Sequence, residues 1–288
     1  MIKGLRPIIT LSVPAFALTI ALVEIFLRLA GYVPYYLDRE GFVPAGDPRV
    51  VYVLRPGWKG LYAGVPVRIN SSGMRGDELG DFASVGLRVV ILGDSMAFGQ
   101  GVPEPETLSE QLRAQLAQVV RQPVSVLNMG IPGHNTCQEY ARFQNEVVRL
   151  KPHVVLLLYY ENDVEPPPFQ VIDGVVFSPD IRPGPLGEMM AALRKHSAAY
   201  NIAWSHWNVV KLQLARGDYA KVVTAKFDDN YPGWKASRQC LVDMIQTAAA
   251  HNIRLLVIPF PVLSGLGEKP YPFARYVEAV CTAAKAAN

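Results

Sequence analysis

The sequence has few cysteines and no marked excess of charge of one sign. Its three cysteines, Cys137, Cys240 and Cys281, are far apart and odd in number, so they form neither a disulfide framework nor a CxxC metal site. We expect them to be small buried apolar residues. The 28 Lys and Arg residues outnumber the 25 Asp and Glu residues by only three, and they form no basic stripe. The charge therefore indicates no nucleic-acid partner.

Apolar residues, by contrast, are abundant and make up 50% of the 288 residues. Near the N-terminus they form a run from Pro7 to Leu29 that is interrupted only by Glu24 and Arg28. This run is long enough to cross a bilayer as a helix. Glu24 and Arg28 are four residues apart, so on a helix their side chains can pair near the outer interface. The sequence thus predicts a transmembrane helix at this position.

The flanks of this run indicate how the chain is placed in the membrane. Lys3 and Arg6 precede it and favour a cytoplasmic N-terminus, which places everything after Gly31 outside the cytoplasm. A cleaved signal peptide is the alternative. However, no clear small-x-small cleavage site is present, and the run is longer than a usual signal-peptide core. We therefore expect a retained membrane anchor and an extracytoplasmic catalytic domain.

The rest of the chain divides into a stalk and one large domain. Residues 32–66 are rich in Pro, Gly and aromatic residues and lack a sustained helical period, which is typical of an irregular segment with short strands. Weak alternation over 65–69 and turn-forming residues at 70–76 predict a β-ribbon. The expected parts are a membrane anchor over 1–31, the stalk and ribbon over 32–87, and an α/β domain over 88–288 with an insertion at about 164–233.

Strands and helices alternate from Arg88 onward. Short continuous runs of branched apolar residues predict buried strands, and the stretches between them have helical character. Such repetition predicts a parallel sheet covered by helices on both faces. The expected strands cover 89–92, 124–128, 154–158 and 253–258, and the expected helices cover 104–120, 136–150, 235–251 and 271–287.

The insertion interrupts this alternation after the third strand. It contains three consecutive prolines at 166–168, a hairpin signal at Asp173-Gly174 and a helical stretch over 189–214. Its aromatic residues either line a substrate groove or pack the insertion on the core, and we expect packing for most of them. These residues are Tyr200, Trp204, Trp207, Tyr219, Tyr231 and Trp234.

The first predicted strand leads directly into Gly93, Asp94 and Ser95 at a strand-to-helix turn. In an open α/β sheet, chemistry gathers at the carboxyl ends of the strands. A Ser placed there lies near a helix N-terminus with its backbone N–H free to face an anion, which suits a nucleophile that also holds an oxyanion. The alternative is an N-cap Ser in an ordinary loop. These residues alone do not separate the two interpretations.

Three predicted strand ends carry residues that suit acyl transfer, namely Ser95, Gly130 and Asn162. Acyl transfer needs a nucleophile and two or three donors aimed at the developing oxyanion. The backbone N–H groups of Ser95 and Gly130 and the side-chain amide of Asn162 can supply these donors. Taken singly, Gly130 is also consistent with a turn, and Asn162 with a loop cap.

These residues resemble the SGNH, or GDSL-type, hydrolase family. The Gly-Asp-Ser at 93–95 is similar to its first block, Gly130 to the glycine of its second block, and the Asn-Asp at 162–163 to its third, although Tyr160 stands where a Gly is usual. The anchor and the stretch 68–75 also resemble membrane-tethered members. The resemblance covers most of the chain from about residue 68. It implies a flavodoxin-like three-layer α/β/α sandwich that hydrolyses or transfers ester-linked acyl groups without a metal or cofactor.

The family also has an Asp-x-x-His block near the C-terminus that supplies the catalytic base, and this chain shows none. A Ser hydroxyl is a poor nucleophile without an adjacent base. His134 follows the second strand at the correct end of the sheet, whereas His153 and His251 precede strands, and His196 and His206 are expected to be structural. Rather than a role for His134 as the base, we expect that the chain stops before its last strand and leaves apolar surface at the sheet edge.

The sequence therefore predicts a membrane-anchored ester hydrolase in which Ser95 is the nucleophile and Ser95, Gly130 and Asn162 form the oxyanion hole. Asp94 and Asp163 are expected to fix the turns through backbone hydrogen bonds rather than to act as bases. The partner is an acyl-ester substrate, and location alone suggests an acylated envelope glycan. The alternatives are an O-acyltransferase on envelope glycans and a non-catalytic glycan-binding or assembly protein.

Overall fold

The structure, a computed structural model, describes residues 5–177, 183–215 and 219–287, apart from the side chains of residues 5–11, 212–215 and 264. Lys3, which contributes to the predicted orientation of the anchor, lies outside the described residues. The chain divides into two compact units. The smaller unit comprises Met1–Asp38, Tyr62–Val65 and Ile181–Gly217, and the larger unit comprises Arg39–Leu61, Pro66–Asp180 and Asp218–Asn288.

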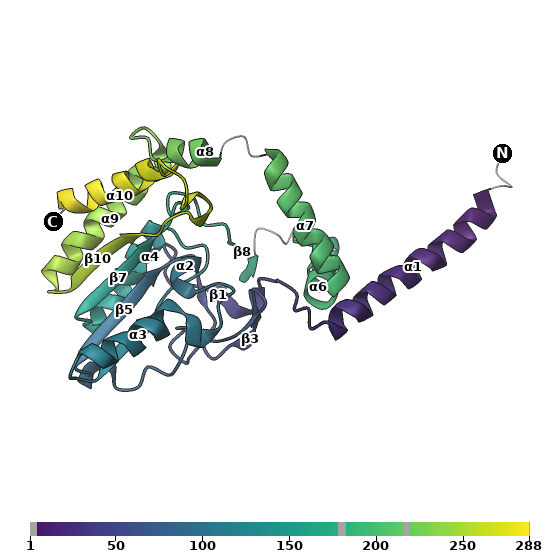
Figure 1. Ribbon diagram of the computed structural model, residues 1–288. Helices are drawn as coiled ribbons and strands as arrows, with labels where there is room; N and C mark the ends of the chain where they lie inside the picture. Colours follow the sequence, from purple (N-terminus) through teal and green to yellow (C-terminus); the bar gives the residue numbers. More distant parts are fainter. Residues whose placement is uncertain (1–4, 178–182, 216–218, 288) are drawn as a thin grey trace. The chain divides into compact units, whose positions relative to one another are not determined.

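A four-stranded parallel sheet forms the centre of the larger unit (Figure 1). Its strands are β5 (Leu87–Gly93), β6 (Val124–Asn128), β7 (Val154–Tyr159) and β10 (Arg254–Pro259), in the spatial order β10-β7-β5-β6. The first of these strands in the chain, β5, therefore lies between the second and the third, as in flavodoxin-like sheets. The predicted parallel sheet and its strand positions are confirmed.

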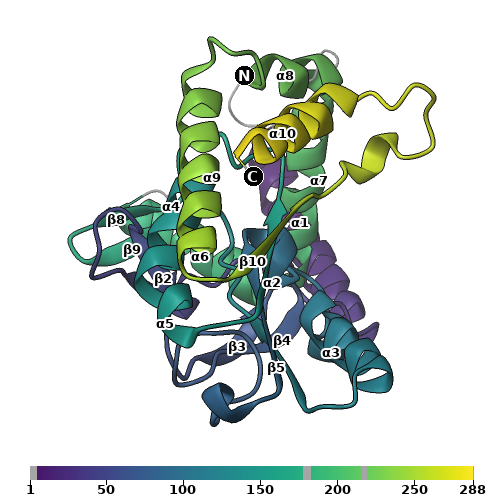
Figure 2. The ribbon, with the colours of Figure 1, turned by 90° about the vertical axis from the view of Figure 1, so that its left-hand side faces the viewer.

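Helices cover both faces of this sheet. They are α2 (Ser95–Phe98), α3 (Leu108–Val119), α4 (Thr136–Arg142), α9 (Pro232–Ala250) and α10 (Ala274–Ala287). Alternate residues of a strand point to opposite faces, so Val90 and Leu92 enter the core beneath α9 and α10, whereas Val89 and Ile91 pack with Leu112 of α3. Figure 2 shows α9 and α10 side by side on their face of the sheet. The predicted three-layer α/β/α arrangement is confirmed.

The strand β10 lies at one edge of the sheet. The described residues cover the apolar side chains on one of its faces only partly. Leu255 and Val257 pack against the main core, but Leu256 and Ile258 are 40% and 37% exposed. The expected apolar exposure at the sheet edge is therefore present. Exposed apolar edge strands invite pairing with other chains.

The helices predicted over 104–120 and 136–150 differ in form from the observed ones. The helix predicted from residue 104 begins at Leu108, because Glu104–Glu106 form a separate 3₁₀ turn and Thr107 is extended. The helix predicted over 136–150 contains a π-helical segment, Phe143–Val147, between α4 and α5 (Val148–Leu150).

Short antiparallel pairs precede the sheet and also follow its third strand. Before the sheet, β1 (Phe42–Pro44) pairs with β2 (Tyr52–Leu54), and β3 (Lys59–Tyr62) pairs with β4 (Val65–Arg68). After β7, β8 (Gln170–Ile172) and β9 (Val175–Phe177) form the predicted hairpin. Asp173 and Gly174 at its tip have φ values of 50° and 75°, the positive pair that a tight hairpin turn requires. The helix α8 (Tyr219–Lys226) completes the insertion in this unit.

The smaller unit contains the apolar N-terminal helix α1 (Leu5–Leu29) together with α6 (Pro185–His196) and α7 (Ala198–Ala215). By length and composition, the window Ser12–Leu29 of α1 suffices to cross a membrane. The stretch predicted as helical over 189–214 is helical, but it forms two helices rather than one continuous helix. The chain breaks at Ser197, whose hydroxyl accepts the N–H of Tyr200 and so begins a new helix.

The structure also corrects the prediction for two of the cysteines. Cys137 of α4 and Cys240 of α9 form a disulfide, whereas Cys281 is free and half-buried. The two bonded cysteines are 103 residues apart in the chain, and only the packing of α4 on α9 brings them together. A structural disulfide is typical of a protein from an oxidising compartment.

Candidate active site

The turn that carries Ser95 is shaped by its two preceding residues. Gly93 ends β5 with a φ of 150°, and a Cβ atom there would lie 2.8 Å from the carbonyl oxygen of Leu158. The chain can therefore turn tightly between neighbouring strands only with glycine at this position. Asp94 then caps α2, because its carboxylate accepts the backbone N–H of Met96 at 2.8 Å. Ser95 follows as the first residue of α2 and is half-buried.

The Asp94 carboxylate brings Ser95 and Asn162 to one place. The hydroxyl of Ser95 donates a hydrogen bond to Oδ2 of Asp94 at 3.2 Å, and the side chain of Asn162 interacts with the same carboxylate and favours its charged form. Asp94 has no exposed surface, and this burial raises the pKa of its carboxyl group. Two of the three predicted site residues therefore face a shared buried acid, which also fixes the turn as expected.

Gly130, the third predicted residue, follows β6 and lies against the backbone of α2. A Cβ atom at Gly130 would lie 2.2 Å from the backbone nitrogen of Phe98 and 2.6 Å from the carbonyl carbon of Ala97. The N–H of Gly130 donates to Oδ1 of Asn128 at 3.1 Å, so in this structure the predicted oxyanion donor is bound to a protein acceptor. Asn128 also donates its Nδ2 to the Phe98 carbonyl at 3.3 Å and thereby ties the end of β6 to α2.

The loop after β7 holds Asn162 through its neighbours. Asp163 is buried, and its Oδ2 accepts the backbone N–H of Tyr160 at 3.3 Å, which closes the turn. At the rim of the loop, Glu161 accepts a hydrogen bond from Tyr219 of α8 at 2.5 Å and pairs with Lys226 at 3.1 Å. The insertion therefore supports this loop, and Asp163 behaves as the turn-fixing residue that the sequence predicts.

Buried acids gather beneath the three strand ends. Burial and the neighbouring carboxylates raise the pKa values of Asp163 and Glu139 well above their ordinary range, and Asp94 contributes to both shifts. Both carboxylate oxygens of Glu139 lack a hydrogen-bond partner among the described residues. Three carboxyl groups that repel one another in a dry interior favour their neutral forms. Glu139 could not be recognised from its position in the chain, because a helical glutamate is ordinarily exposed.

His134 and His153 bind groups other than the Ser95 hydroxyl. His134 is buried, its Nε2 lies 3.0 Å from the Tyr52 carbonyl oxygen, and burial lowers its pKa to about 3. His153 accepts the backbone N–H of Arg88 at the opposite end of the sheet, at 3.1 Å. Within the described part of the chain, no histidine hydrogen-bonds Ser95, and His134 is a structural residue of the core.

Arg75 is a further residue of the site that was missed as a functional candidate. Asn70 folds the preceding turn by accepting the backbone N–H of Met74 at 2.9 Å, so that Arg75 reaches inward. Its guanidinium donates to the carbonyls of Phe98, Gly99 and Val102 at 2.9, 2.6 and 2.6 Å. Arg75 is 4% exposed, and burial lowers its pKa to about 10. It fixes the chain that leaves α2 after Ser95.

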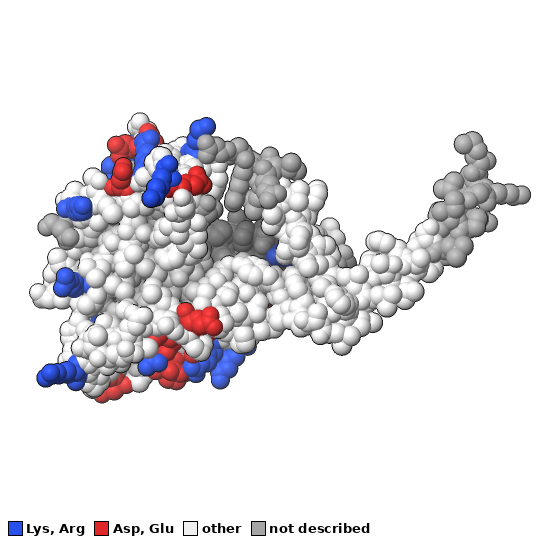
Figure 3. All heavy atoms as spheres, viewed as in Figure 1, with Lys and Arg blue, Asp and Glu red and all other residues white. Residues whose placement is uncertain are grey.

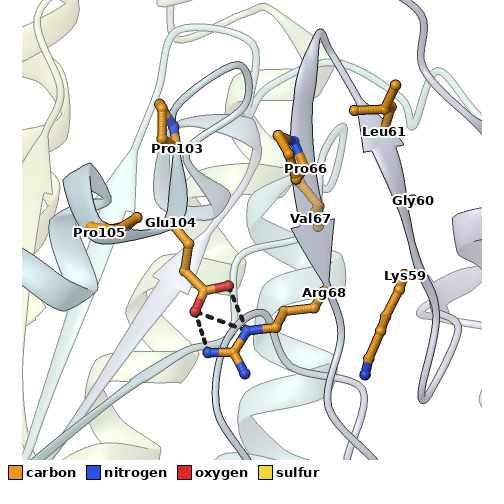
Figure 4. Close-up of a pocket in the computed structure, with 9 residues that line it drawn as sticks. All are labelled: Lys59, Gly60, Leu61, Pro66, Val67, Arg68, Pro103, Glu104 and Pro105. Carbon is orange, nitrogen blue, oxygen red and sulfur yellow. Dashed lines mark hydrogen bonds and ion pairs between the residues drawn. The ribbon is translucent and has the colours of Figure 1, made fainter.

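A cavity of about 670 Å³ lies beside this segment (Figure 4). Its walls come from β3, β4 and the loop 103–105, and they are largely apolar. Arg68 and Glu104 form an ion pair at 2.6 Å on one side of it. Ser95, Gly130 and Asn162 are not part of its lining, so the cavity does not belong to the predicted site.

The surface of the larger unit carries side chains of both charges. On the face drawn in Figure 3, basic and acidic side chains of the larger unit are interspersed. Among the described residues, no group of three or more His, Cys, Asp or Glu side chains is arranged to hold a metal ion.

Comparison with known proteins gives similarity in solved structures only. No protein-family model matches the sequence, and no curated protein matches it. TesA is 17% identical, with a TM-score of 0.37, over 68% of this chain and 74% of its own. A lipase/acylhydrolase from Enterococcus faecalis is 18% identical, with a TM-score of 0.37, over 70% and 73%. AlinE4, an SGNH-hydrolase family esterase, is 15% identical, with a TM-score of 0.36, over 68% and 72%.

Proposed function

We propose that this chain is an ester hydrolase of the SGNH type, with Ser95 as the nucleophile, acting on acyl esters outside the cytoplasm. One observation carries the proposal. Ser95 and Asn162, which follow different strands of the sheet, both interact with the carboxylate of Asp94, to which the Ser95 hydroxyl donates. Gly130 lies within backbone contact of the short helix that Ser95 begins.

In the proposed reaction, the hydroxyl oxygen of Ser95 attacks the ester carbonyl carbon, its proton passes to solvent water, and a tetrahedral intermediate forms. The oxyanion accepts hydrogen bonds from the backbone N–H groups of Ser95 and Gly130 and from the side-chain amide of Asn162. Gly130 contributes because the absence of a Cβ allows its N–H to approach closely. Collapse of the intermediate breaks the ester C–O bond, the alcohol leaves with a proton from water, and the acyl group stays on the Ser95 oxygen. Water, or a sugar hydroxyl if the enzyme is a transferase, then attacks this acyl group, and the Ser95 oxygen leaves and regains its proton. The substrate is an acyl ester, for which an acylated envelope glycan is the candidate.

The location is part of the proposal. The helix α1 has the length and composition of a single membrane span, and the Cys137–Cys240 disulfide suits an oxidising compartment. A membrane-anchored chain whose larger unit lies outside the cytoplasm satisfies both features.

The environment of Ser95 is also consistent with a second function, that of a non-catalytic binding protein. The hydroxyl of Ser95 contacts a carboxylate rather than an imidazole, and a serine needs an adjacent base to become a strong nucleophile. A non-catalytic glycan-binding protein of the same fold would retain the three residues without turnover.

The test uses the full chain in detergent with p-nitrophenyl acetate as substrate and a fluorophosphonate as a serine-directed probe. We expect the probe to label Ser95 and the Ser95→Ala variant to lose both labelling and hydrolysis. Asn162→Ala is expected to lower kcat about 100- to 1000-fold, the usual effect of removing one oxyanion donor. The matched control is Ser84→Ala, an exposed serine of the larger unit, which should behave as wild type. Equal hydrolysis by wild type and Ser95→Ala would refute the assignment, and absence of any labelling would favour the binding protein.

A further inference from the structure

The helices α6 and α7 of the smaller unit form a pair. Hydrogen bonds connect this pair to the C-terminal end of α1. Glu24, in the second-last turn of α1, accepts hydrogen bonds from the Ser197 hydroxyl at 3.0 Å and from the N–H groups of Ala198 and Ala199 at 3.1 and 2.9 Å. Arg28 donates to the carbonyl of His196 at 2.6 Å. The corner between α6 and α7 is therefore held at the level of the last two turns of α1.

The segment that follows α1 strengthens this attachment. Asn201 of α7 is fully buried, and its Oδ1 accepts hydrogen bonds from the Tyr32 hydroxyl at 2.9 Å and from the backbone N–H of Tyr35 at 3.1 Å. Its Nδ2 donates to the carbonyls of Tyr35 and Arg194, both at 2.9 Å. One buried amide thus joins α6, α7 and the chain leaving α1, so the three helices form one body.

Both helices of the pair nevertheless present apolar residues outward. On α6, Leu186, Met189 and Leu193 are exposed at spacings of three and four residues, which places them on one stripe. On α7, Trp207 and Val210 are exposed at a spacing of three residues and form a second stripe. Leu186 is 67% exposed and Trp207 is 58% exposed, so neither stripe is covered within the smaller unit. Packing on the core was expected for most of the insertion aromatics, and Trp207 is one that does not pack.

The composition of α7 fits the membrane interface better than either water or the bilayer core. Lys211 is the only Lys, Arg, Asp or Glu residue in the 18-residue sequence of α7, yet the helix also holds several polar residues and does not qualify as a membrane span. Tryptophan is enriched at the level of lipid headgroups, where an apolar ring with one polar N–H is best accommodated. The ammonium group of Lys211 lies over the Trp204 ring, 5.6 Å from its centroid, so its charge sits beside an aromatic side chain.

We propose that α6 and α7 lie in the outer interface of the membrane, with Leu186, Met189, Leu193, Trp207 and Val210 in contact with the acyl chains of the lipids. This inference rests on the proposed membrane anchoring by α1. Its main support is continuity: Ile25, Phe26 and Leu29 of α1 are exposed apolar residues at the level where Glu24 and Arg28 hold the pair. In Figure 3 the described part of α1 carries no charged side chain on the face drawn. A lipid surface is therefore the partner that covers α1 and both stripes together.

The experiment measures quenching of tryptophan fluorescence by lipids with brominated acyl chains. The full chain is reconstituted in phosphatidylcholine vesicles and in vesicles of brominated phosphatidylcholine. We expect the brominated lipid to quench part of the emission, and the Trp207→Phe variant to lose most of the quenched part. The matched control is Trp234→Phe, which removes a tryptophan from the core of the larger unit and should leave the quenched part unchanged. A Met189→Trp substitution in the Trp207→Phe background should restore quenching and so tests the stripe on α6.

The outcomes separate this inference from the proposed anchoring. If the chain does not float with vesicles, α1 is not an anchor, and both proposals fail. If the chain floats but Trp207 is not quenched, the anchor stands and the interfacial placement of α6 and α7 is overturned. If the fluorescence of Trp207 is not quenched and the Trp207→Cys variant crosslinks two copies of the chain, the two stripes form a protein interface instead.

Discussion

Replacement of Gly130 by alanine tests the most demanding contact of the candidate site. The added Cβ would lie 2.2 Å from the backbone nitrogen of Phe98, 2.6 Å from the carbonyl carbon of Ala97 and 2.8 Å from the Cα of Phe98. All three atoms belong to the backbone of α2, so no side chain can rotate away to relieve the overlap. The end of β6 and the helix that carries Ser95 must separate.

The size of the effect follows from two opposing contributions. Overpacking a well-packed interior costs about 1–3 kcal/mol, and because the displaced atoms are backbone we take about 3 kcal/mol. Replacing glycine by alanine also restricts the unfolded chain, which offsets up to about 1 kcal/mol. The expected net loss is therefore about 2 kcal/mol, and at about 2–4 °C per kcal/mol the Tm falls by about 4–8 °C.

The assay is thermal unfolding of the full chain in detergent, together with fluorophosphonate labelling of Ser95. The matched control is Gly46→Ala, because no atom lies within 4 Å of a Cβ at Gly46. We expect Gly46→Ala to keep the wild-type Tm and labelling, and Gly130→Ala to unfold about 4–8 °C lower and to lose most of the labelling. If the two variants unfold at the same temperature, Gly130 does not lie against α2 and the site as described is wrong.

Three further predictions concern the groups around the site. Burial raises the pKa of Glu139 above its ordinary value of 4.5, so the folded chain keeps a proton that the unfolded chain releases. The free energy of unfolding therefore falls as the pH rises above 4.5, by about 1.4 kcal/mol per pH unit for each such proton. Glu139→Gln should flatten this slope and raise the Tm at pH 8 but not at pH 4, and an unchanged slope would mean that Glu139 is ionised. Maleimide–polyethylene glycol should add one label to the denatured unreduced chain and three after reduction, whereas three labels without reduction would contradict the Cys137–Cys240 bond. Arg75→Lys should lower the free energy of unfolding by about 1–3 kcal/mol, because a lysine cannot reach three carbonyls. Arg113→Lys, in an exposed ion pair, is the control and should lower it by less than about 0.5 kcal/mol. Equal Tm values for the two variants would argue against the Arg75 contacts.

The sheet and the ends of its strands could be predicted because the necessary information is local. Continuous branched apolar runs lead into Gly93, Asn128 and Tyr159, and a parallel sheet places all their carboxyl ends along one edge. The convergence of Ser95 and Asn162 follows from that topology alone. The residue through which they meet, Asp94, was correctly expected to fix the turn.

The parts that the sequence did not predict depend on contacts between distant segments. The carbonyl of Tyr52 binds the ring of His134 from 82 residues away, so a histidine at the correct end of the sheet becomes a core residue. The Cys137–Cys240 bond depends on the packing of α4 on α9. The break at Ser197 is supported by Glu24 of α1, which accepts the first N–H groups of α7. Neither residue type nor periodicity encodes such pairings.

In the proposed reaction, the hydrogen bonds within the site determine how strongly it favours the transition state over the bound substrate. The Asn162 amide interacts with Asp94, and the Gly130 N–H donates to Asn128. A neutral ester carbonyl is a weak acceptor and gains little by competing for donors that already have partners. A tetrahedral oxyanion carries a full charge, and charge-assisted hydrogen bonds are about twice as strong as neutral ones, so it can draw the same donors toward itself. Donors with protein partners thus bind the transition state in preference to the substrate, which is the condition for raising kcat rather than only lowering KM. Asp94 and Asn128 hold these donors in place until charge develops, so the proposed site depends on them as well as on the three residues that would touch the oxyanion.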